Sequence, residues 1–468
     1  MSVEVKHQVS HEVKHLPRHL ECGYGKFRHL YRPCDHHHVK RNKAQRTLQI
    51  LEDNTIPSSA TELGRVGQSR WTQVTIQSAY YGPVPLNCLQ ISPTKYALLY
   101  PIPGKPYDVY VKVIDAQTNK IDIMNPNKNY TWRQLGDCYA TVVDVEEHAS
   151  LAAISYPLRA KEQRGETLTD AEQKQMHDID AKLHPVDIHF AACNYVNFLH
   201  KFGQNNITDT PMLICVHNAK DNGRDIDNAF FMGTCMVFGN GFSMFRAMGT
   251  LDIAGHEFTH GLVTNLAYQG HAGAMNEACA DAGGVAFEQY VYDTHPTIQG
   301  KADFLMGEDN TIGKDNFLRS LADPPLRKQP KQYRDTLWGD PNAEDDEGNV
   351  HINSGLGNYL FYLVCQAKKL DIFDTFQMFK HVYSGLPPYS TYPDFRDAMK
   401  KSNPGDADII AALKAVWLTD DVVTDWYPKI PTGRTLASRK RGFTQTTTTS
   451  SSAVEKKKSK KPTSSESD

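Results

Sequence analysis

Short apolar runs separated by turn residues dominate the chain between residues 71 and 157. Runs such as Ala97-Leu-Leu-Tyr and Asp108-Val-Tyr-Val-Lys-Val-Ile alternate apolar with polar or turn-forming positions, which predicts strands and hairpins. Residues 158–183 are instead rich in charged and helix-favouring side chains, and Thr169-Asp-Ala-Glu resembles a helix start. We therefore expect a β-rich region followed by a solvated helix or linker.

The apolar pattern becomes mostly helical in the second half of the chain. The stretch beginning Ile188-His-Phe-Ala-Ala predicts a buried helix, and Met212-Leu-Ile-Cys-Val predicts a strand after it. Residues 351–418 show helical periodicity with breaks at Gly385-Leu-Pro-Pro and Asn403-Pro-Gly. The pattern as a whole therefore predicts an α+β protein whose C-terminal part is helical.

The two ends of the chain differ from this pattern. Residues 431–468 are rich in Ser, Thr and Lys and cannot bury enough apolar area to fold, so a solvated tail is favoured over a nuclear address. Residues 1–70 are interpreted either as a metal-buffering arm, with Cys22 and Cys34 as further ligands, or as a polar arm with little order. The first forty residues contain His7, His11, His15, His19, His29, His36, His37 and His38.

Composition removes several functional classes. The chain has 468 residues, 40% hydrophobic and 22% charged, with a formal net charge of -3, so neither nucleic acid nor a membrane surface is the expected partner. Its nine scattered cysteines include no Cys-x-x-Cys pair, which is typical of a reducing compartment. The N-terminus lacks an apolar signal region, so we expect a cytoplasmic protein or one exported by an unconventional route.

One stretch carries recognisable chemistry: Asp252-Ile-Ala-Gly-His256-Glu257-Phe-Thr-His260. Positions four apart share one face of a helix, so His256 and His260 would present two imidazoles to one point, with Glu257 beside them. The pattern His-Glu-x-x-His is typical of a zinc site in which the two histidines bind the metal and the glutamate is the general base. The helix therefore predicts a catalytic zinc.

Further motifs follow in a fixed order and resemble the thermolysin family of zinc metallopeptidases over roughly residues 185–420. The resemblance implies a two-lobed α+β fold, with a β-containing N-terminal lobe, an α-helical C-terminal lobe and the active-site helix between them. These motifs are Asn228-Ala-Phe, Asp252-x-x-x-His256-Glu257-x-x-His260, Asn276-Glu277-x-x-x-Asp281, Leu318-Arg319-Ser-x-x-Asp-Pro and Asp346-x-x-x-x-His351-Ile-Asn-Ser-Gly.

The resemblance implies a role for each residue of the site. Glu277 would be the third zinc ligand, and Asp281 would accept the free N–H of His256. Asp346 would hold His351 in the same way. His351 and Tyr268 would donate hydrogen bonds to the tetrahedral oxyanion, while Glu257 would take the proton of a water whose pKa zinc lowers. For Glu277 the alternative is a carboxylate at a helix N-terminus.

The resemblance also implies how a peptide or protein substrate would bind. Asn228 and the Ala229 backbone would pair with extended substrate, and Arg319 would hold the carbonyl next to the cut. Ile253 and Leu318 would wall an apolar pocket for the residue after the scissile bond, with ordinary core packing as the alternative. The expected activity is therefore a zinc endopeptidase that prefers an apolar residue after the cut and acts as a monomer.

A calcium site is implied by carboxylates that match the family pattern: Asp252, Glu288, Asp303 and Glu308. Hard oxygen ligands from several loops suit Ca²⁺, and surface charge is the alternative. Leu305 stands where the family has another carboxylate, so one calcium is expected and not two.

Two departures from the family pattern concern the active-site helix. The connection from His260 to Tyr268 is shorter by about three residues, nearly one helical turn, which predicts an early helix end and leaves two positions open for Tyr268, in the site or displaced from it. Gly255 stands directly before His256, where a glycine either costs about 1 kcal/mol of helix stability or permits hinge motion.

The expected division of the chain is the arm 1–70, a β-rich region 71–157, an N-terminal catalytic lobe 158–270, a helical lobe 271–430 and the tail 431–468. The likeness of Asp108 to Ile123 to a propeptide hairpin suggests that an N-terminal segment is removed. A variant is that Cys34 blocks the zinc before that cleavage. Two rival functions stay open: a noncatalytic zinc-binding protein that kept this scaffold, and a metal-storage protein based on the histidine-rich arm.

Overall fold

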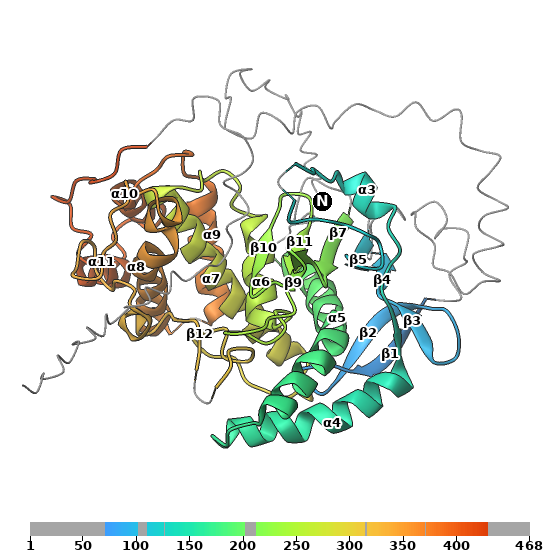
Figure 1. Ribbon diagram of the computed structural model, residues 1–468. Coiled ribbons are helices and arrows are strands. Elements are labelled where there is room, and N and C mark those ends of the chain that lie inside the picture. The colour runs from blue at the N-terminus through green and yellow to red at the C-terminus, as the bar shows by residue number, and fades with distance from the viewer. Residues whose placement is uncertain are drawn as a thin grey trace, which may run out of the picture.

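Strands from distant parts of the sequence form a five-stranded sheet in the N-terminal lobe (Figure 1). Its order is β10 (Ala229–Phe231), β11 (Met236–Phe238), β7 (Met212–His217), β5 (Tyr110–Asp115) and β4 (Leu99–Pro101). The strands β5 and β7 are parallel, and Val111 lies opposite Leu213. Successive side chains of a strand point to opposite faces of the sheet, and here each face packs against its own apolar cluster. The sheet is therefore buried on both sides.

A smaller antiparallel sheet lies beside it in the order β1 (Trp71–Gln77), β2 (Pro83–Gln90), β3 (Lys95–Ala97) and β6 (Val142–Asp144). Its last strand in the sequence, β6, ends at Asp144. There the Asp144 side chain accepts hydrogen bonds from the backbone N–H groups of Glu146 and Glu147 and caps α4 (Val145–Gln163). The predicted boundary at residue 157 is wrong, because α4 runs across it and β5 pairs with β7.

The predicted helix start at Thr169 is confirmed. The Glu172 carboxylate accepts from the Thr169 backbone N–H at 2.8 Å, and the Thr169 hydroxyl accepts from the Glu172 N–H at 3.3 Å. From this capping box α5 (Asp170–Lys201) runs beneath the sheet, and its second half is almost entirely buried, as the apolar pattern predicts. The short helix α3 (Trp132–Gly136) lies near β7 on the opposite side.

The C-terminal lobe is helical, and the breaks predicted at residues 385–388 and 403–405 fall between its helices (Figure 1). Helices α6 (Leu251–His260) and α7 (Gly270–Thr294) join the two lobes and pack against each other. The remaining elements are β8 (Lys220–Asp221), β9 (Arg224–Asp225), β12 (Leu305–Met306), β13 (Arg319–Ser320), the 3-10 helix η3 (Pro324–Arg327), α8 (Asp346–Lys368), α9 (Ile372–Ser384), α10 (Tyr392–Ser402) and α11 (Ala407–Ala415).

This computed structural model describes residues 71–101, 110–125, 127–201, 212–313, 316–369 and 371–428. The histidine-rich arm and the Ser/Thr/Lys tail lie outside the described residues, and so do the interpretations that rest on them. Within the described ranges, no helix is both long and apolar enough to cross a membrane. The seven cysteines that fall in these ranges are free thiols.

Candidate active site

The helix that carries the His-Glu-x-x-His motif is buried along nearly its whole length. Gly255 explains how closely it approaches α7: a Cβ at this position would lie 2.9 Å from Cδ1 of Phe287 and 3.0 Å from Cα of Gly284. Any larger residue would push the two helices apart. The glycine therefore has a packing role. The sequence had offered two other interpretations, a loss of helix stability and a hinge.

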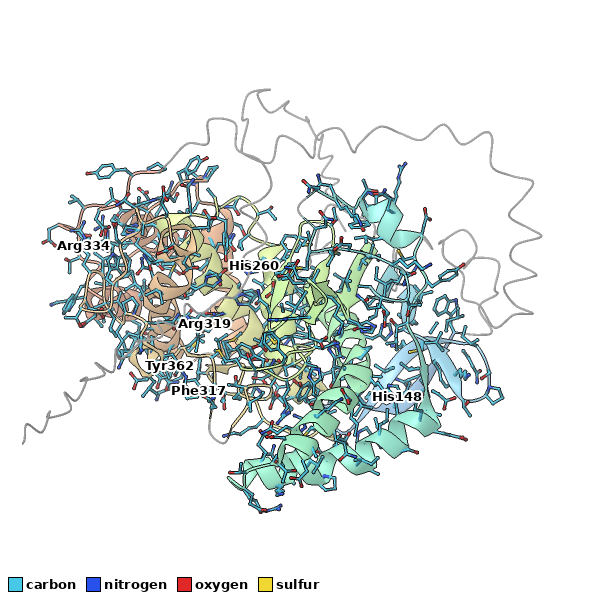
Figure 2. All side chains as sticks on the ribbon, viewed as in Figure 1. His148, His260, Phe317, Arg319, Arg334 and Tyr362 are labelled. Carbon is cyan, nitrogen blue, oxygen red and sulfur yellow. The ribbon has the colours of Figure 1, made fainter. Side chains whose placement is uncertain are left out.

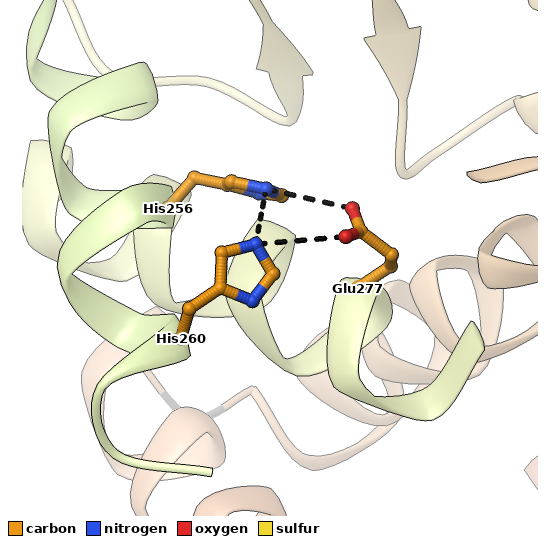
Figure 3. Close-up of side chains that lie close together, drawn as sticks. All are labelled: His256, His260 and Glu277. Atoms are coloured by element: carbon orange, nitrogen blue, oxygen red, sulfur yellow. Dashed lines mark hydrogen bonds and ion pairs between the residues drawn. The ribbon is translucent and has the colours of Figure 1, made fainter. Parts of the chain in front are cut away.

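Three side chains from these two helices converge on one point (Figure 3). The Nε2 atoms of His256 and His260 are 3.0 Å apart, and each lies 3.5 Å from an oxygen of Glu277. Ligands placed about 2.0–2.2 Å from a tetrahedral zinc are separated from each other by about 3.3–3.6 Å. The two histidine–glutamate edges have this length and the edge between the histidines is a few tenths of an ångström shorter, so the triangle is close to the dimensions of three zinc ligands.

The protons on the two imidazoles are assigned by their other neighbours. Nδ1 of His256 lies 2.8 Å from a carboxylate oxygen of Asp281, so it carries the proton. Nδ1 of His260 lies 2.6 Å from Oδ1 of Asn276, whose amide nitrogen donates to the Val263 carbonyl and so turns the oxygen towards the ring. Both Nε2 atoms are therefore lone-pair donors that face each other and a carboxylate.

Such a convergence of electron pairs fits a cation. Oε2 of Glu277 is buried and makes no hydrogen bond within the described residues, although its neighbours are nitrogen lone pairs. Two imidazoles and one carboxylate are a common ligand set of catalytic zinc, which keeps a fourth position open. His256, His260 and Glu277 would hold the metal.

Glu257 lies next to this triangle without belonging to it. Its carboxyl is 2% exposed, and burial raises its pKa to about 7, with His256 lowering it and Glu277 raising it further. A carboxylate beside a metal but not bound to it is in the position that a general base requires.

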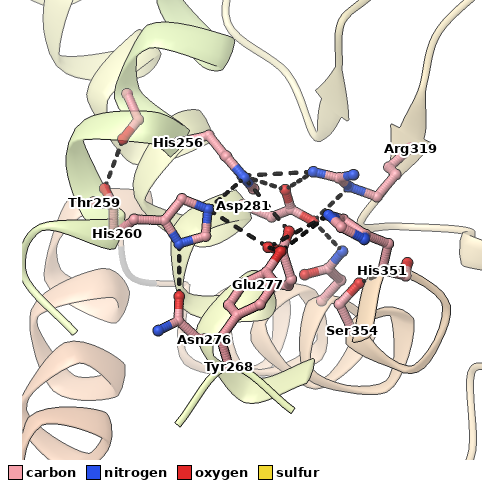
Figure 4. Close-up of polar contacts among 12 residues, drawn as sticks. His256, Thr259, His260, Tyr268, Asn276, Glu277, Asp281, Arg319, His351 and Ser354 are labelled. Carbon is pink, nitrogen blue, oxygen red and sulfur yellow. Dashed lines mark hydrogen bonds and ion pairs between the residues drawn. The ribbon is translucent and has the colours of Figure 1, made fainter. Parts of the chain in front are cut away.

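Tyr268 reaches the site despite the shortened connection, so the displacement that the sequence left open does not occur (Figure 4). Its hydroxyl donates to Oε1 of Glu277 and lies 3.2 Å from Nε2 of His351. The helix α6 ends at His260, and the following turns return the chain directly to α7. The shorter connection therefore shortens the helix and leaves the tyrosine in place. Two hydrogen-bonding groups thus face one edge of the ligand triangle.

A left-handed turn at the start of α8 positions His351. Residues 346–349 all have positive φ, including +48° at Glu347 and +93° at Gly348. This turn folds the Asp346 carboxylate back, where it contacts Nδ1 of His351 and accepts from the His351 backbone N–H at 3.0 Å. Burial lowers the pKa of His351, but the carboxylates of Glu277 and Asp346 outweigh this effect and raise it to about 9.

Arg319 and Asp281 form a buried pair behind His256 (Figure 4). Nε of Arg319 donates to Asp281 at 2.7 Å, and its Nη2 donates to the other carboxylate oxygen. Asn358 from α8 also donates to Asp281, at 2.8 Å. In this structure Arg319 therefore holds Asp281, the carboxylate that orients His256. The predicted role of Arg319, binding a substrate carbonyl, did not include this contact.

Known proteins match this architecture. The family model for the catalytic domain of thermolysin metallopeptidases matches residues 110–264, and the model for their α-helical domain matches residues 264–403, together more than half of the chain. The chain belongs to the thermolysin metallopeptidase family. The resemblance and the α+β two-lobed fold inferred from the motifs are thereby confirmed. The match begins at residue 110, so the hairpin that suggested a propeptide belongs largely to the catalytic domain.

Individual members of the thermolysin family align over shorter lengths. Bacillolysin of Bacillus cereus is 36% identical over 192 residues, which cover 39% of this chain and 31% of that protein. Neutral protease NprE of Bacillus pumilus is 29% identical over 292 residues, 58% of this chain and 89% of that protein. Bacillolysin of Bacillus subtilis (strain 168) has the same identity and length of match, but only 51% of its own length is covered.

The residues that the family resemblance assigns to substrate lie around the site. Ala229 begins β10, an edge strand of the five-stranded sheet, and Asn228 directly precedes it. An edge strand is where an extended peptide could add by backbone pairing. Ile253 and Leu318 are 0% and 4% exposed and belong to the main core, which corresponds to the alternative of ordinary packing; their pocket role remains a prediction.

A second group of acidic residues lies at the opposite end of α6. Glu288, Glu308 and Asp309 bring their carboxylates together, and neither oxygen of Glu288 has a hydrogen-bond partner in the described residues. Burial raises the pKa of Glu288 well above its usual range, and mutual repulsion raises it further. Asp252 lies near enough to add to that repulsion, and its Oδ1 is buried without a partner.

Buried carboxylates that repel one another fit a hard cation such as Ca²⁺. Of the four predicted ligands, Glu288 and Glu308 belong to the close group, while Asp252 and Asp303 lie outside it but near enough to repel its charges. The Asp303 carboxylate accepts from the Leu305 N–H at 2.7 Å. Asp309 was not predicted. Its adjacency to Glu308 in the sequence is the signal that could have found it.

Asn276 is the second residue that sequence reasoning missed as part of the site. It orients His260 in the way that Asp281 orients His256. The signal was present, since both flank Glu277 on α7 and an orienting partner is expected for each ligand histidine.

Proposed function

We propose that this chain is a zinc-dependent endopeptidase that cleaves internal peptide bonds and prefers an apolar residue after the cut. The observation that carries the proposal is the triangle of His256, His260 and Glu277, with a buried carboxylate beside it and two hydrogen-bonding side chains across from it. The alignments cover only part of the length of some relatives, so the activity is inferred from the site and the family together.

Each residue around the triangle has a task in peptide hydrolysis. Zinc, when bound, supplies Lewis-acid polarisation and lowers the pKa of water. Glu257 accepts the proton from the attacking water and passes it to the leaving amine. Tyr268 and His351 lie on the side where the tetrahedral oxyanion would develop, and His351 is kept charged by Glu277 and Asp346. Such donors contribute typically 10²–10³ in rate each.

The edge strand β10 supports endopeptidase action on extended chains. A substrate that pairs with the Asn228–Ala229 backbone would run past the metal triangle, because β10 packs against α6. Cleavage of a peptide library followed by sequencing of the products tests the preference: Leu, Ile or Phe should be enriched directly after the cut. An even distribution at that position would contradict the apolar pocket.

Glu257→Gln tests the chemistry directly. The amide keeps the volume but cannot accept a proton, so casein cleavage should fall by about 10²–10⁴, while the zinc content stays equal to that of the parent by metal analysis. Equal cleavage by parent and variant at equal zinc would sink the assignment of Glu257.

The competing function is a noncatalytic zinc-binding protein on the same scaffold. It predicts stoichiometric zinc without any chelator-sensitive peptide cleavage, in the full chain and after removal of residues 1–70. The presence of Glu257, Tyr268 and His351 together favours the peptidase, because zinc binding alone uses none of them.

A further inference from the structure

The last described residues, 421–428, fold back over the helical lobe near the entry to α7. We refer to this segment as the C-terminal clamp. It lies outside the residues that match the α-helical domain of the family, which end at residue 403. Two of its residues are nevertheless well anchored in this lobe. Trp426 is buried, and the half-buried Asp425 contacts His271.

Asp425 collects donors from two elements. The Tyr333 hydroxyl donates to Oδ1 at 2.6 Å, the Trp338 indole N–H donates to Oδ2 at 3.2 Å, and Nε of Arg334 lies 3.1 Å from Oδ2. Arg334 is at the outer side of the helical lobe in Figure 2. On its inner side Asp425 lies 2.9 Å from Nε2 of His271, which is fully buried in the first turn of α7.

The protonation of His271 follows from its second contact. The backbone N–H of Tyr392 donates to Nδ1 at 3.3 Å, so the proton resides on Nε2, the atom that lies 2.9 Å from Asp425. Four aromatic rings surround the imidazole, with centroids 5.5–5.7 Å away: Tyr333, Trp338, Tyr392 and Trp426. The clamp is thereby tied to the helix that carries Glu277.

Trp426 is 2% exposed, stacks on His271 at an interplanar angle of 23° and presses on Gly270. A Cβ on Gly270 would lie 2.1 Å from the indole nitrogen, and φ at this residue is +49°. Only glycine permits this approach together with this backbone conformation. The indole therefore defines where the chain turns into α7, two residues after Tyr268.

The same glycine contacts the turn that carries His351. A Cβ on Gly348 would lie 3.0 Å from Gly270 and 2.4 Å from the carbonyl oxygen of Pro341. The next residue, Asn342, donates to the Asp425 carbonyl at 3.0 Å and accepts from the Tyr427 N–H at 3.1 Å. The clamp, the entry to α7 and the left-handed turn thus form one continuous set of contacts.

We propose that Asp425 and Trp426 are positioning residues: by holding His271 and Gly270 they fix both the loop that carries Tyr268 and the turn that carries His351. This inference rests on the proposed function in assigning those two side chains to the oxyanion. It adds that their placement depends on a segment outside the matched family domain. The two ligand histidines are held separately by Asp281 and Asn276, and Glu277 lies two helical turns beyond Gly270 on α7, so we expect the clamp to act mainly on the donors.

Trp426→Ala in the full zinc-loaded chain tests this. We expect kcat to fall roughly 30- to 300-fold, by analogy with the loss of an oxyanion donor, with KM within about threefold and zinc content unchanged. Affinity for a phosphinic peptide, whose tetrahedral anion imitates the transition state, should fall by a similar factor. Affinity for a thiol peptide that binds through the metal alone should stay within about threefold.

The matched control is Tyr427→Ala, because this neighbour is 73% exposed and holds the structure through its backbone N–H. It should leave kcat, KM, the zinc content and both inhibitor affinities unchanged. Asp425→Asn keeps the volume of the side chain while removing its charge, and should show a weaker form of the same selective loss. Trp426→Phe, which restores a stacking ring, should recover most of the phosphinic affinity.

Two results would overturn the proposal. One is unchanged phosphinic affinity in Trp426→Ala; the other is loss of zinc or of thiol affinity in both Trp426→Ala and Asp425→Asn, which would assign the clamp to folding alone. Because inhibitor binding needs no turnover, a parent chain that fails to cleave peptides would contradict the proposed function while the selective loss could still be measured.

Discussion

Histidine serves opposite purposes in this chain, and its neighbours decide which. In His256 and His260 a hydrogen-bonded Nδ1 leaves Nε2 as a metal ligand. In His351 two carboxylates favour the charged ring, which suits a donor to an oxyanion. His189 is different again: its Nε2 lies 2.8 Å from the Asn87 carbonyl, and among the described residues its Nδ1 has no hydrogen-bond partner and no carboxylate raises its pKa.

His189 should make the N-terminal lobe sensitive to acid. Burial lowers its pKa to about 4, while an unfolded chain has a value of about 6.5. The unfolded state therefore takes up a proton first, and stability is lost as the pH falls from about 6.5 towards 4. With 1.36 kcal/mol for each unit of pKa, the loss is at most roughly 3 kcal/mol.

Denaturant unfolding of His189→Gln at several pH values measures this effect. The amide can still donate to the Asn87 carbonyl but does not titrate. The slope of the free energy of unfolding against pH should therefore correspond to about one proton less taken up on unfolding between pH 6.5 and 4. His381→Gln, at an exposed position, is the matched control. An unchanged pH dependence in His189→Gln would contradict the buried neutral ring.

At the scale of elements, the site depends on irregular segments as much as on helices. The shortened connection after His260 still delivers Tyr268, because α6 ends early and α7 begins at Gly270. The left-handed turn of residues 346–349 costs conformational energy at each non-glycine position, about 1–2 kcal/mol per residue. Its hydrogen bonds and its packing against Gly270 hold it in place.

Gly348→Ala should disrupt this turn. The new Cβ would meet the Pro341 carbonyl oxygen at 2.4 Å in a backbone conformation with φ of +93°. We expect kcat to fall at least tenfold as His351 moves, and stability to fall by about 1–3 kcal/mol. Peptide cleavage and thermal unfolding measure the two effects.

Gly405→Ala separates the two causes. Its φ is +75°, but no atom lies within 4 Å of the added Cβ. It should lose about 1 kcal/mol of stability from backbone strain and keep the parental kcat. If Gly348→Ala behaves in the same way, the contact with Pro341 does not position His351.

For the molecule as a whole, the acidic group near Glu288 joins the α6–α7 pair to the loop that carries Glu308 and Asp309. Without a cation, these buried carboxylates repel each other. We expect calcium removal by a selective chelator, with zinc replenished, to lower the melting temperature by several degrees, and excess calcium to restore it.

With Glu288→Gln, whether the variant or the parent has the higher melting temperature should depend on calcium. The variant lacks one buried charge, so it should melt above the parent in chelator and below it in calcium. Thermal scans of both proteins in both buffers measure this. A melting temperature that is indifferent to calcium in the parent would contradict the site.

The sequence by itself indicated the family, the helical C-terminal lobe and the three side chains that converge in the triangle, because the spacing of His-Glu-x-x-His on a helix and the order of its companion motifs are both written locally in the sequence. It also supplied Asp281 and Asp346, which the family pattern assigns. The places of Asn276 beside His260 and of Asp309 in the acidic group were missed although local signals were present, and the helix over residues 145–157 was not predicted. The contact of β5 with β7 joins segments about a hundred residues apart, and local periodicity carries no information on such pairing.

Only the tertiary structure decided whether Tyr268 reaches the site and what Gly255 is for. Both answers depend on the distance between α6 and α7, which is set by side chains that meet across the two helices. The clamp is a further case: Asp425 and Trp426 show no motif, and their relation to Gly270 exists only because the chain folds back after α11. Spacing along a helix is written locally in the sequence, whereas close approach between distant segments is decided by packing.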